Sequence, residues 1–176
     1  QARELASRDP LTGVLNRREF FKRGMVALNL AIRHKRPLSI MILDIDYFKR
    51  FNDHYGHQLG DDVLVVFGKY CKANFRKSDI LGRYGGDEFI ALLPETSVEQ
   101  AANLARRINN EVKKIWKDDC GVNSQLGMSI GLAEVSELDQ VLTLEKLIDR
   151  ADRALYTAKK IGRDKYSIWQ RNKVIS

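Results

Sequence analysis

The hydrophobic residues of this chain follow a strand-like period in some segments and a helical period in others. Residues 39–43 form a continuous apolar run, as in a strand buried on both faces. Shorter runs at 80–83 and 89–93 flank a pair of adjacent glycines and predict hairpin strands that end at Pro94. Further strands are predicted at 126–134 and, at an edge of the sheet, at 166–169.

Helices are predicted where apolar residues recur every three or four positions. Asn16 and Glu19 are typical of an N-cap and its partner, opening a helix to about His34. The inward face of that helix is expected to include Phe20, Phe21, Met25, Leu28 and Ile32. Three more long helices are predicted from about 59, from a capping box at 97–100, and over 144–161, with a short helix before Gly56 and a polar loop at 118–125.

Strands and helices alternate irregularly around the glycine hairpin, and no internal repeat is present. We therefore predict the α+β class, with a mostly antiparallel central sheet flanked by helices. The length of 176 residues suits one domain, and 44% hydrophobic with 30% charged residues is a globular composition.

Acidic residues follow the glycine pair and form the first candidate site. Adjacent glycines predict a tight turn because glycine accepts the positive φ of primed hairpins, which would place Asp87 and Glu88 at the tip. Two neighbouring carboxylates repel each other, so a cation such as Mg²⁺ would satisfy them. The alternative is a solvated turn, because this is ordinary loop composition.

A second acidic site follows the apolar run of 39–43. Asp44 and Asp46 are two residues apart and share one face if the strand continues that far. They would place negative charge where a buried sheet reaches solvent. Alternatively, these aspartates simply end the strand and cap the next helix.

The net charge of +7 indicates an anionic partner. Nucleic acid, a membrane surface and a nucleotide triphosphate all carry such charge, but no nucleic-acid-binding signature is present, so a nucleic acid polymer is not expected. No apolar run approaches a membrane span, and no secretory signal opens the sequence. Cys71 and Cys120 lack metal-ligand spacing and are interpreted as reduced thiols, consistent with a cytoplasmic domain.

Several ordered motifs resemble those of the GGDEF domain, the diguanylate cyclase family. The resemblance covers about residues 8–165. The matching segments are DPLTG at 9–13, NRR at 16–18, DIDYFK at 44–49, ND at 52–53, GHQLGD at 56–61, GGDEF at 85–89, SIG at 129–131 and ADRALY at 151–156, with AK at 158–159 and GR at 162–163. The resemblance implies the palm-like, ferredoxin-related fold of nucleotidyl cyclases.

The resemblance also implies a metal-dependent phosphoryl-transfer site. It assigns Asp44, the carbonyl of Ile45 and Asp87 to metal ions, and Glu88 to metal binding or to activation of the nucleophile. Three carboxylates that converge at one sheet edge suit two-metal chemistry. The expected cofactor is Mg²⁺, with Mn²⁺ as the alternative, two ions per active site.

Cationic residues near the C-terminus are candidates for binding phosphate. Lys159 and Arg163 are four apart at a predicted helix end and would lie on one face, although basic residues there also offset the helix dipole. The resemblance makes the phosphate role the better interpretation. It adds Lys49 and the backbone amides of Tyr47 and Phe48.

The resemblance assigns guanine recognition to Asn52 and Asp61. An aspartate can accept from guanine N1–H and N2–H, and an asparagine amide can complete the edge. From the residues alone, Asp61 is equally a helix N-cap and Asn52 an ordinary surface residue.

The implied reaction condenses two GTP into cyclic di-GMP and two pyrophosphates. Because one domain offers one nucleotide pocket, an antiparallel homodimer is expected. The segment RKSD resembles the family's R-x-x-D site for inhibition by the product; Arg76, Asp79 and the more distant Arg107 are its members. A local ion pair is the alternative interpretation of Arg76 and Asp79.

Domain limits follow from the same matches. Residues 1–7 are interpreted as the end of an upstream linker, 8–170 as the catalytic domain and 171–176 as a tail. The chain would thus be a cytoplasmic domain of a multidomain or membrane-anchored bacterial protein with an upstream sensor or receiver domain.

Three other functions compete with the cyclase. They are a non-catalytic receptor for cyclic di-GMP or GTP, a nucleotidyltransferase with another product, and a dimerisation module. The intact Asp87 and Glu88 argue against a receptor, and Asp61 favours GTP.

Overall fold

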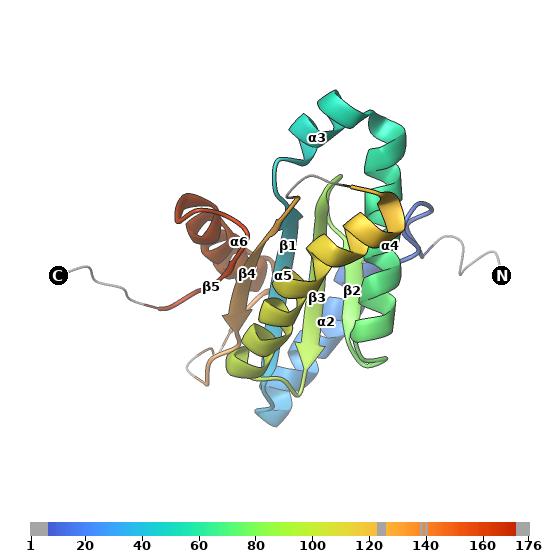
Figure 1. Ribbon diagram of the computed structural model, residues 1–176. Helices are drawn as coiled ribbons and strands as arrows, with labels where there is room; N and C mark the ends of the chain where they lie inside the picture. Colours follow the sequence, from blue (N-terminus) through green and yellow to red (C-terminus); the bar gives the residue numbers. More distant parts are fainter. Residues whose placement is uncertain (1–6, 123–125, 138, 140, 172–176) are drawn as a thin grey trace.

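A five-stranded sheet forms the centre of the computed structural model, which describes residues 7–122, 126–137, 139 and 141–171. The strand order is β2-β3-β1-β4-β5, and only the β4–β5 pair is parallel (Figure 1). The predicted α+β class with a mostly antiparallel sheet is confirmed. The strands are β1 Leu38–Ile45, β2 Ile80–Arg83, β3 Glu88–Pro94, β4 Met128–Glu134 and β5 Tyr166–Ile168.

Two pairs of long helices cover the two faces of the sheet. The helices are α2 Arg17–His34, α3 Phe48–Tyr55, α4 His57–Asn74, α5 Val98–Cys120 and α6 Leu144–Lys160. Helices α4 and α5 pack on one face with Met41 and Leu43 of β1, whereas α2 and α6 pack on the other with Ile40 and Ile42. All eight residues of β1 are buried, as the apolar run predicted. The short helix α3 lies beyond the end of β1 (Figure 1).

The helix caps agree with the sequence predictions. The Asn16 side chain accepts a hydrogen bond from the Glu19 amide, with an N–O distance of 2.9 Å. Ser97 and Gln100 form the complete capping box at the start of α5. Each cap satisfies amides that lack a partner within the helix.

Two local predictions were wrong. Met25 is half exposed, and the buried position beside it is Gly24, where a Cβ atom would lie 2.8 Å from Leu92 Cδ1. Helix α5 continues to Cys120 and ends at Gly121 with φ 65°, so the polar segment 118–125 begins inside a helix. The polar residues of this segment were interpreted as a loop, but the exposed face of a helix is polar as well. Positions 123–125 lie outside the described residues.

In the part of the chain that the structure describes, no helix is long and apolar enough to cross a membrane.

Gly131 lets helix α6 approach strand β4. A Cβ atom at position 131 would lie 2.5 Å from the Leu155 amide nitrogen and would also overlap the Ala151 carbonyl oxygen. Backbone atoms cannot yield as a flexible side chain can, so the helix would have to move. Glycine at this position therefore sets how closely the helix and strand backbones approach each other.

We expect Gly131→Ala to lower the free energy of unfolding by about 3 kcal/mol, the upper end of the usual cost of overpacking. Urea titration followed by circular dichroism measures the change. Gly86→Ala is the matched control, because a Cβ atom there meets nothing within 4 Å. Equal stability of the two variants would contradict this account of Gly131.

Candidate active site

The pairing of β1 with β3 brings the two acidic segments together. Asp44 is the Cα partner of Glu88 in this register, and the Ile45 amide donates to the Asp87 carbonyl at 3.2 Å. Side-chain alternation places Asp44 and Glu88 on the same face of the sheet as α2 and α6. The predicted meeting of the two segments at one end of the sheet is therefore observed.

The turn before Asp87 differs from the predicted one. Neither Gly85 nor Gly86 has a positive φ, and the loop between β2 and β3 holds four residues, 84–87. Glu88 is the first residue of β3 and is half-buried, so it does not lie at the tip. The glycines are used differently: Gly85 is tightly packed, with Glu88 Oε2 3.2 Å from the place of a Cβ atom, whereas Gly86 is open.

Burial and crowding of negative charge raise the proton affinity of the cluster. Asp44 is buried, and desolvation raises its pKa from 3.8 to about 6; the Lys159 hydrogen bond opposes this, and the Asp87 and Glu88 charges add to it. The pKa of Glu88 is also raised, chiefly by its burial. Asp44 Oδ2 forms an ion pair with Lys159 Nζ, while Asp44 Oδ1 is buried and has no hydrogen-bond partner in the described part of the chain.

These oxygens fit a divalent cation. Carboxylate and carbonyl oxygens are the ligands that Mg²⁺ prefers, and a cation would satisfy the unpartnered Asp44 Oδ1. Among the described residues, no three His, Cys, Asp or Glu side chains already converge as a metal site. The Lys159 ammonium supplies the positive charge beside Asp44 in this structure.

Two cations reach the same end of β1 from the end of α6. Because α6 ends at Lys160, Arg163 lies beyond the helix, and the prediction that it shares a helical face with Lys159 was wrong. Its guanidinium nevertheless lies 4.4 Å above the Tyr47 ring and 3.9 Å from Asp46 Oδ1. The structure thus places Lys159 near Asp44 and Arg163 near Asp46.

Tyr47 directs the start of α3 toward this region. It is the N-cap residue in a left-handed conformation, with φ 56°, and its side chain makes no capping bond. The first amides of a helix have no partner within the helix and suit an anion. Lys49 is exposed in the same turn.

Asn52 and Asp61 lie on α3 and α4, two helices that pack together. Asn52 Oδ1 is buried without a partner, next to Gly60, where a Cβ atom would overlap it. Asp61 is exposed inside α4, whose N-cap is Gly56, so the interpretation of Asp61 as a helix cap was wrong. Helix capping therefore does not explain Asp61, and an ordinary surface position does not explain the buried oxygen of Asn52.

Sequence reasoning assigned no role to Asp9 and Arg83, which hold the loop after β2. The Arg83 guanidinium contacts both oxygens of Asp9 at 3.2 Å and donates to the Gly86 carbonyl at 2.8 Å. Asp9 in turn accepts hydrogen bonds from the amide and hydroxyl of Thr12. The DPLTG motif was the available signal, and its partner was not deducible without the fold.

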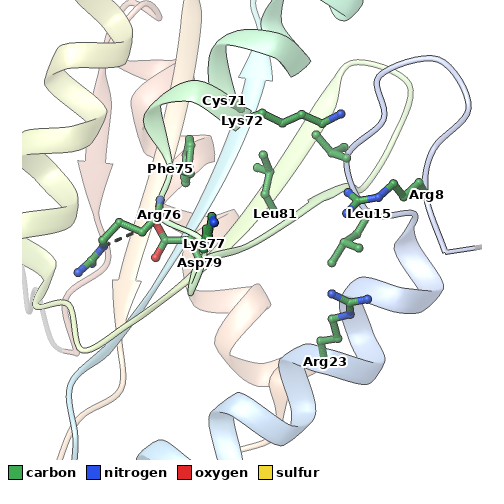
Figure 2. A pocket seen from close by; sticks show the side chains of 11 residues that line it. Arg8, Leu15, Arg23, Cys71, Lys72, Phe75, Arg76, Lys77, Asp79 and Leu81 are labelled. Atoms are coloured by element: carbon green, nitrogen blue, oxygen red, sulfur yellow. Dashed lines mark hydrogen bonds and ion pairs between the residues drawn. The ribbon is translucent and has the colours of Figure 1, made fainter. Parts of the chain in front are cut away.

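Arg76, Asp79 and Arg107 all line one cavity of about 390 Å³. The Asp79 carboxylate is almost fully buried and accepts from the Arg76 amide at 2.8 Å, with Arg76 Nε at 3.8 Å; its Oδ1 has no hydrogen-bond partner. Arg76 and Asp79 also border a second cavity of about 400 Å³. Figure 2 shows the Arg76 side chain pointing away from the wall of that second cavity formed by Arg8 and Arg23.

The sheet, with carboxylates at one end and cations facing them, has the palm-like fold of the nucleotidyl cyclases. The family model described as "Diguanylate cyclase, GGDEF domain" matches residues 6–165. This chain therefore belongs to the GGDEF-domain family.

Named relatives agree with this assignment. The chain is 40% identical over 166 residues to diguanylate cyclase DosC of Escherichia coli K12, covering 92% of this chain and 35% of that protein. It is 36% identical to probable diguanylate cyclase DgcT of the same strain, with 93% and 36% covered. The chain thus spans about a third of the length of these relatives.

Solved structures show the same fold. The GGDEF domain of DgcB from Caulobacter crescentus in complex with c-di-GMP has a TM-score of 0.83 at 28% identity, with 94% of each chain covered. The GGDEF domain of PA1120 from Pseudomonas aeruginosa has a TM-score of 0.81 at 32% identity, covering 93% of this chain and 94% of that one.

The raised pKa of Asp44 predicts a pH-dependent stability. Because folded Asp44 holds its proton more tightly than the unfolded chain, its contribution is full below pH 3.8 and is lost as the pH rises through about 6. In metal-free buffer, the unfolding free energy of the parent minus that of Asp44→Asn should fall by about 1–3 kcal/mol across this window. Urea titrations at several pH values measure this difference in unfolding free energy. A difference that stays constant or rises with pH would contradict the raised pKa of Asp44.

Proposed function

We propose that this domain condenses two GTP molecules into cyclic di-GMP and releases two pyrophosphates. The observation that carries the proposal is the β1–β3 register, which sets Asp44 opposite Glu88 with Lys159 directed at the same carboxylate. Membership of the GGDEF family, and a structural neighbour in complex with c-di-GMP, support it.

The acidic end of the sheet would hold the catalytic cations. Asp44, the Ile45 carbonyl, Asp87 and Glu88 are the proposed ligands of two Mg²⁺ ions, with Mn²⁺ as a substitute. Such ions activate the attacking hydroxyl and neutralise charge on the leaving pyrophosphate. Glu88 would alternatively accept a proton from a 3′-hydroxyl, a role that its raised pKa favours.

The rest of the pocket would bind the nucleotide. Lys159, Arg163, Lys49 and the amides of Tyr47 and Phe48 would contact phosphate oxygens. Asp61 would accept from guanine N1–H and N2–H, and the Asn52 amide would complete the guanine edge.

The reaction requires a second copy of the domain. Each 3′-hydroxyl attacks the α-phosphate of the other nucleotide, and each domain offers one such pocket, so two domains must face each other in antiparallel orientation. The rest of the longer protein, with an upstream sensor or receiver domain, would control this pairing.

A non-catalytic receptor for cyclic di-GMP or GTP is the second candidate. The observation that favours catalysis is the electrostatic state of the acidic cluster. Buried, mutually repelling carboxylates such as Asp44 and Glu88 cost stability, and a receptor would gain nothing from keeping them.

We expect the protein to form cyclic di-GMP when incubated with GTP and Mg²⁺, with chromatography resolving the products. Asp87→Ala should lower the rate at least 100-fold, because loss of a ligand disrupts the metal that neutralises the transition state. Glu95→Ala is the control: Glu95 is exposed at the opposite end of β3. Rates should rise more steeply than enzyme concentration until the dimer is saturated. GTP binding without product would favour the receptor.

The R-x-x-D residues are proposed as an inhibitory product site. They line one cavity, and the unpartnered Asp79 Oδ1 can accept from a guanine edge while Arg76 and Arg107 contact base or phosphate. The ion pair between Arg76 and Asp79 does not exclude this role, because Arg76 Nε lies 3.8 Å from the carboxylate and can be recruited by a ligand.

Arg76→Ala should raise the half-inhibitory concentration of cyclic di-GMP at least tenfold. A loss of this size is typical when a charge-assisted hydrogen bond is removed. The rate without product should stay within about twofold of the parent. Arg33→Ala, an exposed arginine at the end of α2, is the matched control. Unchanged inhibition of Arg76→Ala would remove this site from the proposal.

A further inference from the structure

Asp46 is a buried carboxylate that none of the roles above uses. It is 5% exposed and both its oxygens are bonded: Oδ1 accepts from the Ser129 hydroxyl at 2.6 Å and Oδ2 from the Asp164 amide at 2.9 Å. Its own amide donates to the Gly127 carbonyl at 2.9 Å. Asp46 thereby joins the end of β1 to the start of β4 and to the turn after α6.

Asp46 differs from Asp44 because both of its carboxylate oxygens accept hydrogen bonds. Asp44 keeps one buried oxygen without a hydrogen-bond partner among the described residues and pairs its other oxygen with the long side chain of Lys159, which leaves the first oxygen available to a ligand. Asp46 offers its oxygens to a hydroxyl and to a fixed backbone amide. A group bonded in this way holds protein structure and is a poor metal ligand.

The turn that Asp46 holds is strained. Gly162, Arg163 and Asp164 have φ values of 123°, 61° and 50°, so three consecutive residues occupy the left-handed half of backbone space. Non-glycine residues adopt this conformation only with steric strain between Cβ and the backbone. The turn needs outside support, and the bond from the Asp164 amide to Asp46 supplies it on one side. The bond from the Arg163 amide to the Ala158 carbonyl supplies it on the other.

Arg163 is the residue that this strained turn presents. Its Nη1 lies 3.9 Å from Asp46 Oδ1, too far for a strong hydrogen bond, and its guanidinium stacks 4.4 Å above Tyr47. No hydrogen bond from the guanidinium to another described residue is present, and the contact with Tyr47 orients the group. Such preorganisation lowers the cost of binding an anion.

We propose that Asp46 is a positioning residue that holds the turn after α6 so that Arg163 faces the triphosphate of the substrate, and that Asp46 is not a metal ligand. This inference rests on the proposed function, because Arg163 is assigned to phosphate there. It concerns a residue of the DID motif whose alternatives, metal site or helix cap, the sequence left open. Asp46 caps no helix, because the N-cap residue of α3 is Tyr47 and makes no side-chain capping bond.

A double-mutant cycle tests the proposal. Calorimetry with a non-hydrolysable GTP analogue and Mg²⁺ would compare the parent, Asp46→Ala, Arg163→Ala and the double variant. We expect each single variant to weaken binding about tenfold, and Asp46→Ala to have less than a twofold effect once Arg163 is absent. Additive losses would overturn the proposal.

Two controls separate positioning from other roles. If Asp46 were a metal ligand, Asp46→Ala would raise the Mg²⁺ concentration for half-maximal binding in both backgrounds, which would overturn the proposal. Ser129→Ala removes one donor but leaves the Asp164 bond, and we expect less than a twofold loss. A loss equal to that of Asp46→Ala would show that Asp46 merely tethers β4.

The outcomes also separate this inference from the proposed function. If Asp46→Ala fails to fold, as judged by circular dichroism, Asp46→Leu takes its place in the cycle, because leucine has no acceptor oxygen and fills a similar volume. If the parent binds the analogue but makes no cyclic di-GMP, the proposed function fails while the cycle still decides the role of Asp46. If the parent makes product and the Asp46 variants bind the analogue like the parent, the inference alone fails.

Discussion

The placement of strand β1 between β3 and β4 is the constraint on which the rest of the structure depends. The apolar residues of β1 are shared between two cores, so its register is fixed on both faces. A slip of one residue would turn Asp44 and Asp46 into the core beneath α4 and α5. The hydrophobic pattern of the strand therefore also decides where the carboxylates lie, and it directs both toward the end of α6, where Lys159 and Arg163 are found.

The site is held by groups that differ in how freely they can move. Backbone pairing sets Asp44 against Glu88, and the Asp9–Arg83–Gly86 contacts hold the loop between β2 and β3 from outside the sheet. Lys159 and Arg163 reach in from a helix end and a turn. The acidic half is thus fixed by sheet geometry, whereas the basic half depends on side-chain bonds such as those of Asp46. The neighbouring carboxylates repel one another, so they need the more rigid support that the sheet backbone provides.

Much of this arrangement was accessible from the sequence because local signals agreed with the fold. The buried strand, the two caps and the edge strand followed from periodicity and from side chains that bond within three residues. Long-range partners were not accessible: no local pattern links Asp9 to Arg83 or Asp46 to Asp164. The left-handed turn at 162–164 was missed because two of its residues are not glycine. Met25 was misplaced because Gly24 takes its position for a steric reason that hydrophobicity does not encode.

The ion pair between Lys159 and Asp44 has a consequence for the order in which ligands enter the proposed site. The Lys159 ammonium group neutralises the carboxylate that a divalent cation would need. A divalent cation without a nucleotide must therefore displace this ammonium group. When a nucleotide binds together with its cation, a phosphate can replace Asp44 as the partner of Lys159. The Asp44 carboxylate then becomes available to the cation. Under the proposed function, the site would thus discriminate against free cations and admit the metal–nucleotide complex as one unit.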